Sequence, residues 1–152
     1  MVQKKFHTKA IWRSDQSYSG NSSSSKTHTT LIKGKLPLVI SAAKEFKGDG
    51  TKYNPEDLLL TALTSCHMMS YFYVCQQNNI DLISYEDEAE GILSLNKDAS
   101  GAFSLVTLRP KVQISEGNHL QLAKELHKQA HELCFIANSC NFEIRIVPVL
   151  FV

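Results

Sequence analysis

The stretch that decides the fold is YNPEDLLLTALTSCH, residues 53–67. Asn54 can accept hydrogen bonds from the free amides at the start of a helix, and Pro55 suits the first helical position because it has no N–H to lose. The two acidic residues that follow favour the positive end of the helix dipole. The sequence therefore predicts a helix that begins at Pro55 and runs to about Gln77.

Apolar side chains are spread around the whole circumference of this predicted helix. They are Leu58, Leu59, Leu60, Leu63, Met68, Met69, Tyr71, Phe72 and Val74. A helix that is apolar on every side is buried on every side. We therefore expect a central helix that the rest of the fold encloses.

The other segments show strand patterns and one further helix. Strand patterns occupy residues 3–13, 26–34, 36–41, 82–98, 102–115 and 142–152, and the sequence at 96–101 is typical of a hairpin turn. A second helix begins at Asn118, with an apolar stripe of Leu122, Leu126, Ala130 and Leu133. The polar stretch 14–25 is expected to be a loop. This order predicts an α+β fold with a largely antiparallel sheet, in a single domain over residues 1–152.

The composition is that of an ordinary globular domain, since 43% of the 152 residues are hydrophobic and 20% are charged. The net charge is only +1 and there is no basic run, so we expect no nucleic-acid partner. Polar residues interrupt the apolar run 58–74, which argues against a membrane span. Residues 1–12 lack the apolar part of a secretory signal, so we expect a cytoplasmic protein.

Four cysteines in a reducing compartment favour reactive thiols, a metal site or inert buried thiols over structural disulfides. Cys66 and Cys75 fall on opposite faces of the first helix, and Cys75 is most simply a core thiol. On the second helix, His127, His131 and Cys134 stand at i, i+4 and i+7, on one face. A half-buried thiol beside a cation is expected to have a lowered pKa. Alternatively, the histidines are solvated and Cys134 belongs to the core.

Two functional hypotheses use these residues. In the first, Cys134, His131 and His127 join Cys66 or His67 around a zinc ion, since the ligand types suit zinc although no paired Cys-x-x-Cys motif is present. In the second, Cys66 is an attacking thiolate and Cys134 resolves it. The second hypothesis requires the two helices to bring the Cα atoms within about 7 Å of each other.

The segment GTKYNPEDLLLTALTSCHMM, residues 50–69, resembles the Asn-Pro-Glu signature of the OsmC/Ohr family, the osmotically inducible protein C and organic hydroperoxide resistance proteins. In that signature a Cys follows the Glu by ten positions, as Cys66 follows Glu56 here (66 − 56 = 10). The motif AIW at 10–12 and AHELCFIANS at 130–139 follow the family order, so the resemblance covers nearly the whole chain.

The resemblance implies thiol peroxidase chemistry. Cys66 matches the peroxidatic cysteine that attacks an organic hydroperoxide, and Cys134 matches the resolving cysteine that condenses with the sulfenic acid to a disulfide. An external dithiol reductant, such as a lipoylated protein, restores the thiols, and no metal or organic cofactor is required. The family fold is an intertwined homodimer, with antiparallel sheets around two long central helices and active sites at the subunit interface.

The resemblance also assigns an acid and a cation. Glu56 matches the family's acid, which orients an arginine that stabilises the thiolate. Ten residues of straight helix span about 15 Å, so Glu56 cannot touch Cys66 of its own chain without an intervening group or a partner subunit. Alternatively, Glu56 serves only the helix dipole. Arg13 is the candidate arginine, because residues 36–50 contain lysines and no arginine; Arg109 and Arg145 are the other two in the chain.

The sequence departs from the family at the second cysteine and carries an extra one. Phe135 follows Cys134 where much of the family has proline, and Cys140 is interpreted as a structural or incidental thiol. The principal hypothesis is a cytoplasmic peroxidase for organic hydroperoxides, with an apolar lining from Leu59, Leu63, Met69, Phe72 and Phe135. The alternatives are an OsmC-like dimer that acts as a redox sensor or small-ligand binder with little peroxidase activity, and a zinc-binding structural domain.

Overall fold

The computed structural model describes residues 2–13 and 26–152, apart from the side chain of Asn118. The loop predicted at 14–25 lies outside the described residues. The chain forms two compact units, residues 1–58 and 59–152, each of which is described by itself. The expectation of a single domain over residues 1–152 stays a prediction.

The first unit is a small antiparallel sheet with the strand order β1–β2–β3. These strands are Lys9–Ile11, His28–Leu31 and Leu38–Ile40, followed by the short 3-10 helix η1, Lys44–Phe46. β1 is much shorter than the predicted 3–13, and Phe6 is 92% exposed. β1 is short because only three of its residues pair with β2, whose partners run from Leu31 to Thr29.

The long helix α1, Pro55–Gln77, has the predicted bounds. Its first turn is capped reciprocally, because the Asp57 N–H donates to Asn54 Oδ1 at 2.8 Å and the Asn54 N–H donates to Asp57 Oδ2 at 3.3 Å. This arrangement satisfies two of the amides that a helix start leaves free. The local sequence therefore fixes where α1 begins.

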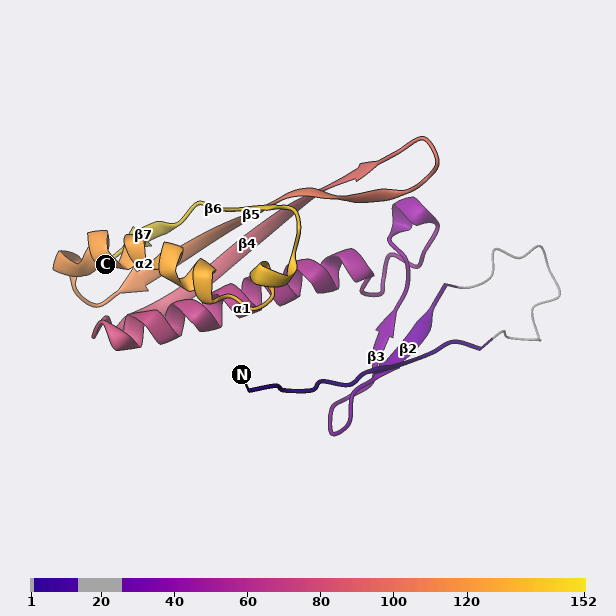
Figure 1. Cartoon of the computed structure of the whole chain (residues 1–152), viewed down its shortest axis with the longest axis horizontal. Helices are drawn as coiled ribbons and strands as arrows, with labels where there is room; N and C mark the ends of the chain where they lie inside the picture. Colours follow the sequence, from indigo (N-terminus) through magenta and orange to yellow (C-terminus); the bar gives the residue numbers. More distant parts are fainter. Residues whose placement is uncertain (1, 14–25) are drawn as a thin grey trace. The chain divides into compact units, whose positions relative to one another are not determined.

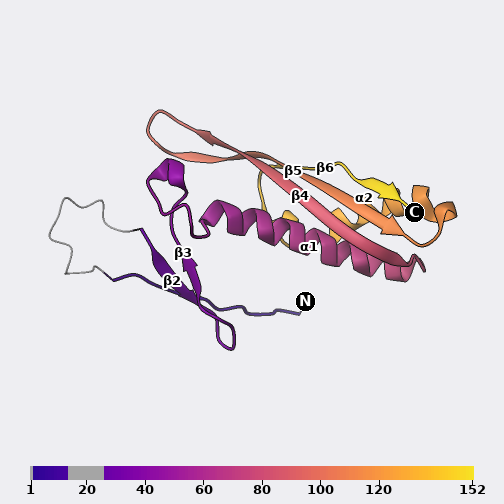
Figure 2. The same cartoon turned by 180° about the vertical axis from the view of Figure 1, so that it is seen from behind.

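The second unit is built on a hairpin of two long strands, β4, Leu82–Leu95, and β5, Gly101–Ile114. Their register pairs Leu82 with Ile114 and Leu95 with Gly101, and the turn between them confirms the predicted hairpin. Residues of β4 alternate between more and less exposed, as expected for a sheet with one covered face. Figures 1 and 2 show α1 and the helix α2, Leu120–Leu133, running along the same face of this sheet. The 3-10 helix η2, Gly117–His119, leads into α2.

The end of the chain differs from the single predicted strand. It forms two strands, β6, Glu143–Ile146, and β7, Val149–Phe151, both parallel to β5, so the sheet is mixed. Pro148 lies between them and cannot donate a ladder hydrogen bond, which interrupts the strand. The parallel direction follows from α2, which carries the chain back along the sheet before β6 begins.

A shared core joins the two helices to the sheet. Its buried members are Tyr71, Val74, Cys75, Ile80, Val112, Ile114, Ala123, Leu126 and Ala130. A second cluster packs Leu63 of α1 against Val106 and Leu108 of β5. The buried stripe of α2 is Ala123, Leu126, His127 and Ala130, whereas Leu122 and Leu133 of the predicted stripe are 39% and 40% exposed. The core face of α2 is therefore rotated from the prediction.

The expectation that α1 is buried on every side is wrong for the single chain. Met69 and Tyr73 are 57% and 56% exposed, and Phe72 is 41% exposed. α1 is the one helix among the described residues that is long and apolar enough to cross a membrane by length and composition alone. Its other face packs in the core of the second unit.

Candidate functional site

The structure places the thiols of Cys66 and Cys134 near each other, since Cys66 acts on the pKa of Cys134. Cys66 lies in the middle of α1 and is partly exposed, whereas Cys134 lies at the end of α2 and is 1% exposed. The Cys66 side chain is near enough to contribute to the raised pKa of Cys134. We call these two residues the thiol pair. Their roles as peroxidatic and resolving cysteines stay predictions.

Cys134 is held by the way α2 ends. Its backbone is extended, and its N–H donates to the carbonyl of His131 at 3.1 Å. Its sulfur accepts the N–H of Ala137 at 3.4 Å, at the start of the 3-10 helix η3, Ala137–Ser139. The Asn138 side chain donates to the carbonyl of Glu132, which satisfies one of the free carbonyls at the helix end. The turn after α2 therefore fixes the position of the Cys134 thiol.

The expectation of a half-buried Cys134 with a lowered pKa is wrong. Burial raises the pKa of Cys134 to about 11, and the neighbouring thiol of Cys66 adds to that effect. Removing the thiol from water disfavours its charged form, and the nearby histidine of the same face, His127, is not a cation in this environment. Cys134 is therefore a neutral thiol at pH 7.

A second contact between α1 and α2 is made by two buried histidines. His67 and His127 are 1% and 3% exposed, and His67 Nε2 lies 3.0 Å from His127 Nδ1. The His127 ring also stacks on Tyr71, with ring centroids 3.9 Å apart, and the Tyr71 hydroxyl donates to the Ala123 carbonyl at 2.9 Å. We call His67 and His127 the histidine pair.

Burial keeps the histidine pair neutral. It lowers the pKa of His67 to about 4 and that of His127 to about 3, and mutual charge repulsion contributes at His127. The charge of His131 further lowers the pKa of His67. One buried nitrogen of each ring has no hydrogen-bond partner among the described residues, namely His67 Nδ1, His127 Nε2 and His131 Nδ1. Each of these three imidazoles thus keeps one buried nitrogen without a hydrogen-bond partner among the described residues.

The sequence analysis offered His127 either as a zinc ligand or as a solvated residue, and it did not predict a buried hydrogen bond with His67. The signal was its spacing, since His127 stands four residues after Ala123 and three before Ala130, on the stripe that the structure buries. His67 gave no such signal, because the apolar residues of α1 surround it on all sides.

Glu56 lies in the first turn of α1, ten residues before Cys66 on the same continuous helix. Its Oε2 atom is buried and has no hydrogen-bond partner among the described residues. A buried carboxylate oxygen normally has a donor. The Glu56 carboxylate is therefore available to accept a hydrogen bond, and no hydrogen bond in the described part of the chain joins this oxygen to the thiols.

The three arginines divide between the two units. Arg13 is exposed in the first unit, and its role at the thiolate stays a prediction. In the second unit, Arg109 lies 3.7 Å from Glu90, and Arg145 lies 2.8 Å from Glu143, with both guanidinium groups about half exposed on the sheet. These two arginines are engaged with glutamates of the sheet.

The zinc hypothesis finds no support in the described residues. Within residues 2–13 and 26–152, no group of three or more His, Cys, Asp or Glu side chains could hold a metal ion. His67 Nε2 and His127 Nδ1 are hydrogen-bonded to each other, so neither nitrogen is available to bind a metal ion.

The other two cysteines lie outside the thiol pair. Cys75 is 1% exposed and belongs to the core, as predicted, and burial raises its pKa. Cys140 is partly exposed, its thiol donates to the Ile136 carbonyl at 3.2 Å, and burial raises its pKa.

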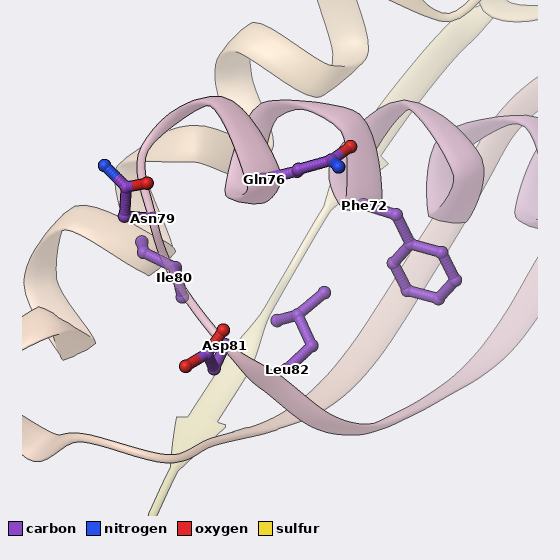
Figure 3. A pocket seen from close by; sticks show the side chains of 6 residues that line it. All are labelled: Phe72, Gln76, Asn79, Ile80, Asp81 and Leu82. Carbon is purple, nitrogen blue, oxygen red and sulfur yellow. The ribbon is translucent and has the colours of Figure 1, made fainter.

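A cavity of about 520 Å³ opens where α1 ends and β4 begins. Figure 3 shows the side chains that line it: Phe72, Gln76, Asn79, Ile80, Asp81 and Leu82. Of the predicted apolar lining, only Phe72 borders this cavity, while Leu63 is buried in the core and Phe135 is 80% exposed. None of the thiols or the three clustered histidines lines it.

Comparisons with known proteins agree on the family. The sequence profile of the family described as OsmC-like protein matches residues 48–148. An uncharacterized protein of Bacillus subtilis, YmaD, is 25% identical over 142 residues, which cover 91% of this chain and 88% of that protein.

Two solved structures illustrate the likeness in fold. An OsmC-like protein of unknown function from Vibrio cholerae superposes with a TM-score of 0.88 and 28% identity, over 97% of this chain and 100% of that one. An organic hydroperoxide resistance protein OsmC from Legionella pneumophila superposes with a TM-score of 0.73 and 20% identity, over 100% of both chains. The profile match spans well over half of the sequence, and the chain therefore belongs to the OsmC-like protein family.

Proposed function

We propose that this protein is a thiol-dependent peroxidase that reduces organic hydroperoxides. The observation that carries the proposal is that the partly exposed thiol of Cys66 lies near enough to the buried thiol of Cys134 to act on its pKa. A peroxidase of this kind needs one thiol that a substrate can reach and a second thiol close enough to form a disulfide with it. Family membership supports the same chemistry, because relatives include proteins called organic hydroperoxide resistance proteins.

The chemistry runs in three steps. The Cys66 thiolate attacks one peroxide oxygen, the O–O bond breaks, and the alkoxide leaves as the alcohol after it takes up a proton; Cys66 becomes a sulfenic acid. The Cys134 sulfur then attacks the Cys66 sulfur, and the S–O bond breaks with release of water. An external dithiol, such as a lipoylated protein, finally reduces the disulfide by thiol–disulfide exchange.

The two thiols suit different roles. Cys134 is 1% exposed and its raised pKa keeps it protonated at pH 7, so it is poorly placed to meet a substrate first. Cys66 is the more accessible of the two. We therefore assign the peroxide-attacking role to Cys66 and the resolving role to Cys134.

The working assembly in this proposal is a cytoplasmic homodimer. The exposed apolar face of α1, which includes Met69, Phe72 and Tyr73, is the kind of surface that a second subunit covers. A second subunit also offers a donor for the unpartnered Glu56 oxygen, through Arg13 or another cation. No metal or organic cofactor enters the proposed cycle.

The proposal is tested by following consumption of cumene hydroperoxide with dithiothreitol or dihydrolipoamide as the reductant. Wild-type protein should consume the hydroperoxide in many turnovers, and Cys66→Ser should abolish turnover because the peroxide-attacking thiol is gone. Cys140→Ser is the matched control, since it removes a partly exposed thiol that makes no contact assigned to the cycle. Cys140→Ser should retain activity within about twofold of the wild type.

Absence of hydroperoxide consumption above the buffer rate by the wild-type protein would overturn the enzyme assignment. If in that case one equivalent of hydroperoxide still converts the thiol pair to a disulfide, the protein reacts with peroxide once and acts as a redox sensor. Equal activity of Cys66→Ser and wild type would move the chemistry to another residue.

A further inference from the structure

We propose that His67 and His127 are positioning residues, whose hydrogen bond sets the register of α1 against α2 and so holds the Cys134 thiol where it can resolve Cys66. The proposal rests on the proposed function, because it assigns a role in the resolving step of that cycle. In this role neither histidine touches the hydroperoxide, and both act through the thiol pair. The Asn-Pro-Glu signature and the cysteine spacing point to neither of them.

The hydrogen bond of the histidine pair belongs to a line of contacts along both helices, which we call the seam. Tyr71 of α1 donates to the Ala123 carbonyl of α2 at 2.9 Å. One turn earlier in α1, His67 Nε2 lies 3.0 Å from Nδ1 of His127, which stands one turn later in α2. The partners rise along α2 as they fall along α1, so the two helices run in opposite directions (Figure 1).

The thiol pair lies at the next step of the seam. Cys66 directly precedes the histidine of α1, and it is near enough to Cys134 to act on the pKa of that thiol. The turn after α2 is anchored as well, because Ile136 and Ala137 pack against the buried cluster that contains Leu63, one turn before Cys66. The thiol pair is therefore held between an apolar contact on one side and the histidine pair on the other.

The two kinds of contact constrain the seam differently. Hydrophobic packing is non-directional, so the apolar cluster around Leu63 tolerates a small slide of one helix along the other. A hydrogen bond weakens steeply as its distance and angle depart from their optimum. A slide of about 1.5 Å, the rise of one helical residue, would misalign the bond between His67 and His127. The histidine pair is therefore the contact that can fix the register.

The chemistry of the pair indicates a role other than stability. Both rings are buried, and His67 Nδ1 and His127 Nε2 have no hydrogen-bond partner among the described residues. These nitrogens lose their bonds to water on folding, and an apolar pair of the same shape would avoid that cost. Burial lowers the pKa of His67 to about 4 and that of His127 to about 3, so both rings are neutral at pH 7. A buried polar pair of this kind specifies position rather than adding stability.

The resolving step is the step of the cycle that depends on this register. The Cys134 sulfur attacks the Cys66 sulfur, the S–O bond breaks, and the hydroxyl leaves as water with the proton of Cys134. The two side chains must meet the narrow geometry of a disulfide, and a misplacement of about 1 Å can slow such a step roughly a hundredfold. The first step requires only that the hydroperoxide reach Cys66. Loss of the histidine bond should therefore slow the second step.

The test compares the full-length wild type with three variants. In the apolar variant, His67→Leu with His127→Phe, the bond is removed and no nitrogen is left unpaired. In the amide variant, His67→Gln with His127→Asn, the amide groups stand at the positions of Nε2 and Nδ1, so the bond can form again. The control for general loss of stability is Asn78→Ala, which removes a 2.8 Å hydrogen bond to the Val74 carbonyl and touches neither histidine.

The first measurement is a competition for the sulfenic acid of Cys66, followed by intact-protein mass spectrometry without a reductant. Resolution by Cys134 gives the disulfide, whereas attack on a second molecule of cumene hydroperoxide gives the sulfinic acid and a second molecule of alcohol. The hydroperoxide concentration that yields equal amounts of the two products is proportional to the rate of resolution.

For the apolar variant, the concentration that yields equal products should fall at least about tenfold below that of the wild type, because Cys134 reaches the sulfenic acid less often. The amide variant should recover to within about threefold of the wild type, since its bond restores the register. Asn78→Ala should match the wild type within about twofold.

The second measurement is the reduction potential of the Cys66–Cys134 disulfide in dithiothreitol buffers, which needs no peroxide. A tenfold loss of effective concentration between the thiols makes the disulfide tenfold less favourable, so the potential of the apolar variant should rise by about 30 mV. The amide variant should return toward the wild-type potential, and Asn78→Ala should not change it. Residues that only stabilise the fold would leave both measurements of the native protein unchanged.

The outcomes separate this inference from the proposed function. If the wild type reduces hydroperoxide and the apolar variant matches it in both measurements, the positioning role is wrong and the peroxidase assignment stands. An amide variant that behaves like the apolar one would also overturn the role of the hydrogen bond. If the wild type does not react with hydroperoxide but the potential shifts in the apolar variant and returns in the amide variant, the histidines position the thiol pair and the peroxidase assignment is wrong.

The apolar variant must keep the native fold for these comparisons. If it loses its native circular dichroism, His67→Met with His127→Leu takes its place, since these side chains also remove both rings and leave no unpaired nitrogen. The same two measurements then decide, with the same results for and against the proposal.

Discussion

His67 Nε2 and His127 Nδ1 lie 3.0 Å apart at the contact between α1 and α2, with both rings buried. One of the two nitrogens carries the proton and the other accepts it, so protonation of the accepting nitrogen would break the hydrogen bond. Cys66 directly precedes His67 in α1, and Cys134 follows His127 at the end of α2, so the same two elements carry both pairs.

Acid should destabilise the fold through the histidine pair. The pKa values of about 4 for His67 and about 3 for His127 are below the ordinary value of 6.5. The unfolded chain therefore takes up protons first, and stability present above pH 6.5 is lost as the pH falls toward 4. The loss should approach about 1.4 kcal/mol per pH unit for each histidine over that range. Urea unfolding monitored by circular dichroism at several pH values measures it.

The double variant His67→Leu with His127→Phe is the matched test of that assignment. It replaces both hydrogen-bonding rings with apolar groups, so it leaves no unpaired nitrogen behind. Its unfolding free energy should depend much less on pH between 6.5 and 4. A slope equal to that of the wild type would show that other groups cause the acid sensitivity.

Removing the Tyr71 hydroxyl should weaken the same seam. Tyr71 is fully buried and its hydroxyl donates to the Ala123 carbonyl at 2.9 Å, so Tyr71→Phe should lower the unfolding free energy by about 1–2 kcal/mol. Tyr53→Phe is the control, because Tyr53 is 57% exposed, and it should change stability by less than about 0.5 kcal/mol. Equal effects of the two substitutions in urea unfolding would contradict the importance of the buried hydroxyl.

The cap of α1 should make a measurable contribution to stability. Asn54→Ala removes the acceptor for the Asp57 N–H and should cost about 1 kcal/mol, as judged by thermal unfolding. Asn54→Ser keeps a short side-chain acceptor and should restore most of the loss. A serine variant as unstable as the alanine variant would mean that the side-chain oxygen is not the stabilising group.

The exposed apolar face of α1 should hold two copies together. Met69 and Tyr73 are one turn apart and more than half exposed, so replacing both with Glu places two charges on this face. Light scattering coupled to gel filtration should give a dimeric mass for the wild type and a monomeric mass for the double variant. Lys124→Glu, on the exposed side of α2, should remain dimeric. A wild type that is monomeric at micromolar concentration would exclude this dimer.

The local features of the fold followed from the sequence. Asn54 and Pro55 set the start of α1, and the turn between β4 and β5 was predicted from its polar residues, because caps and turns depend on neighbours in the chain. The division of the last strand was not predicted, although Pro148 marks it. β6 and β7 pair with β5 in parallel because α2 carries the chain back to the other end of the sheet. The pattern of residues within the strand does not show this.

The family resemblance identified Cys66 and Cys134 as candidate site residues, and the structure places them near enough for Cys66 to act on the pKa of Cys134. Their roles stay predictions. The resemblance did not indicate that Cys134 is buried and protonated, because burial at a helix end depends on the packing of η3 and the sheet. His127 was misjudged for a related reason, since a polar residue on a buried stripe is recognised only when its partner, here His67, is known.

The central claim is that Cys66 and Cys134 form a working redox pair, and intact-protein mass spectrometry tests it most directly. After one equivalent of cumene hydroperoxide, the wild-type mass should fall by two hydrogens, and peptide mapping should find a Cys66–Cys134 disulfide. Cys134→Ser should instead gain one oxygen atom at Cys66, since its sulfenic acid has no resolving thiol. A wild-type protein that keeps its mass, or that retains an added oxygen without forming the disulfide, would contradict the account.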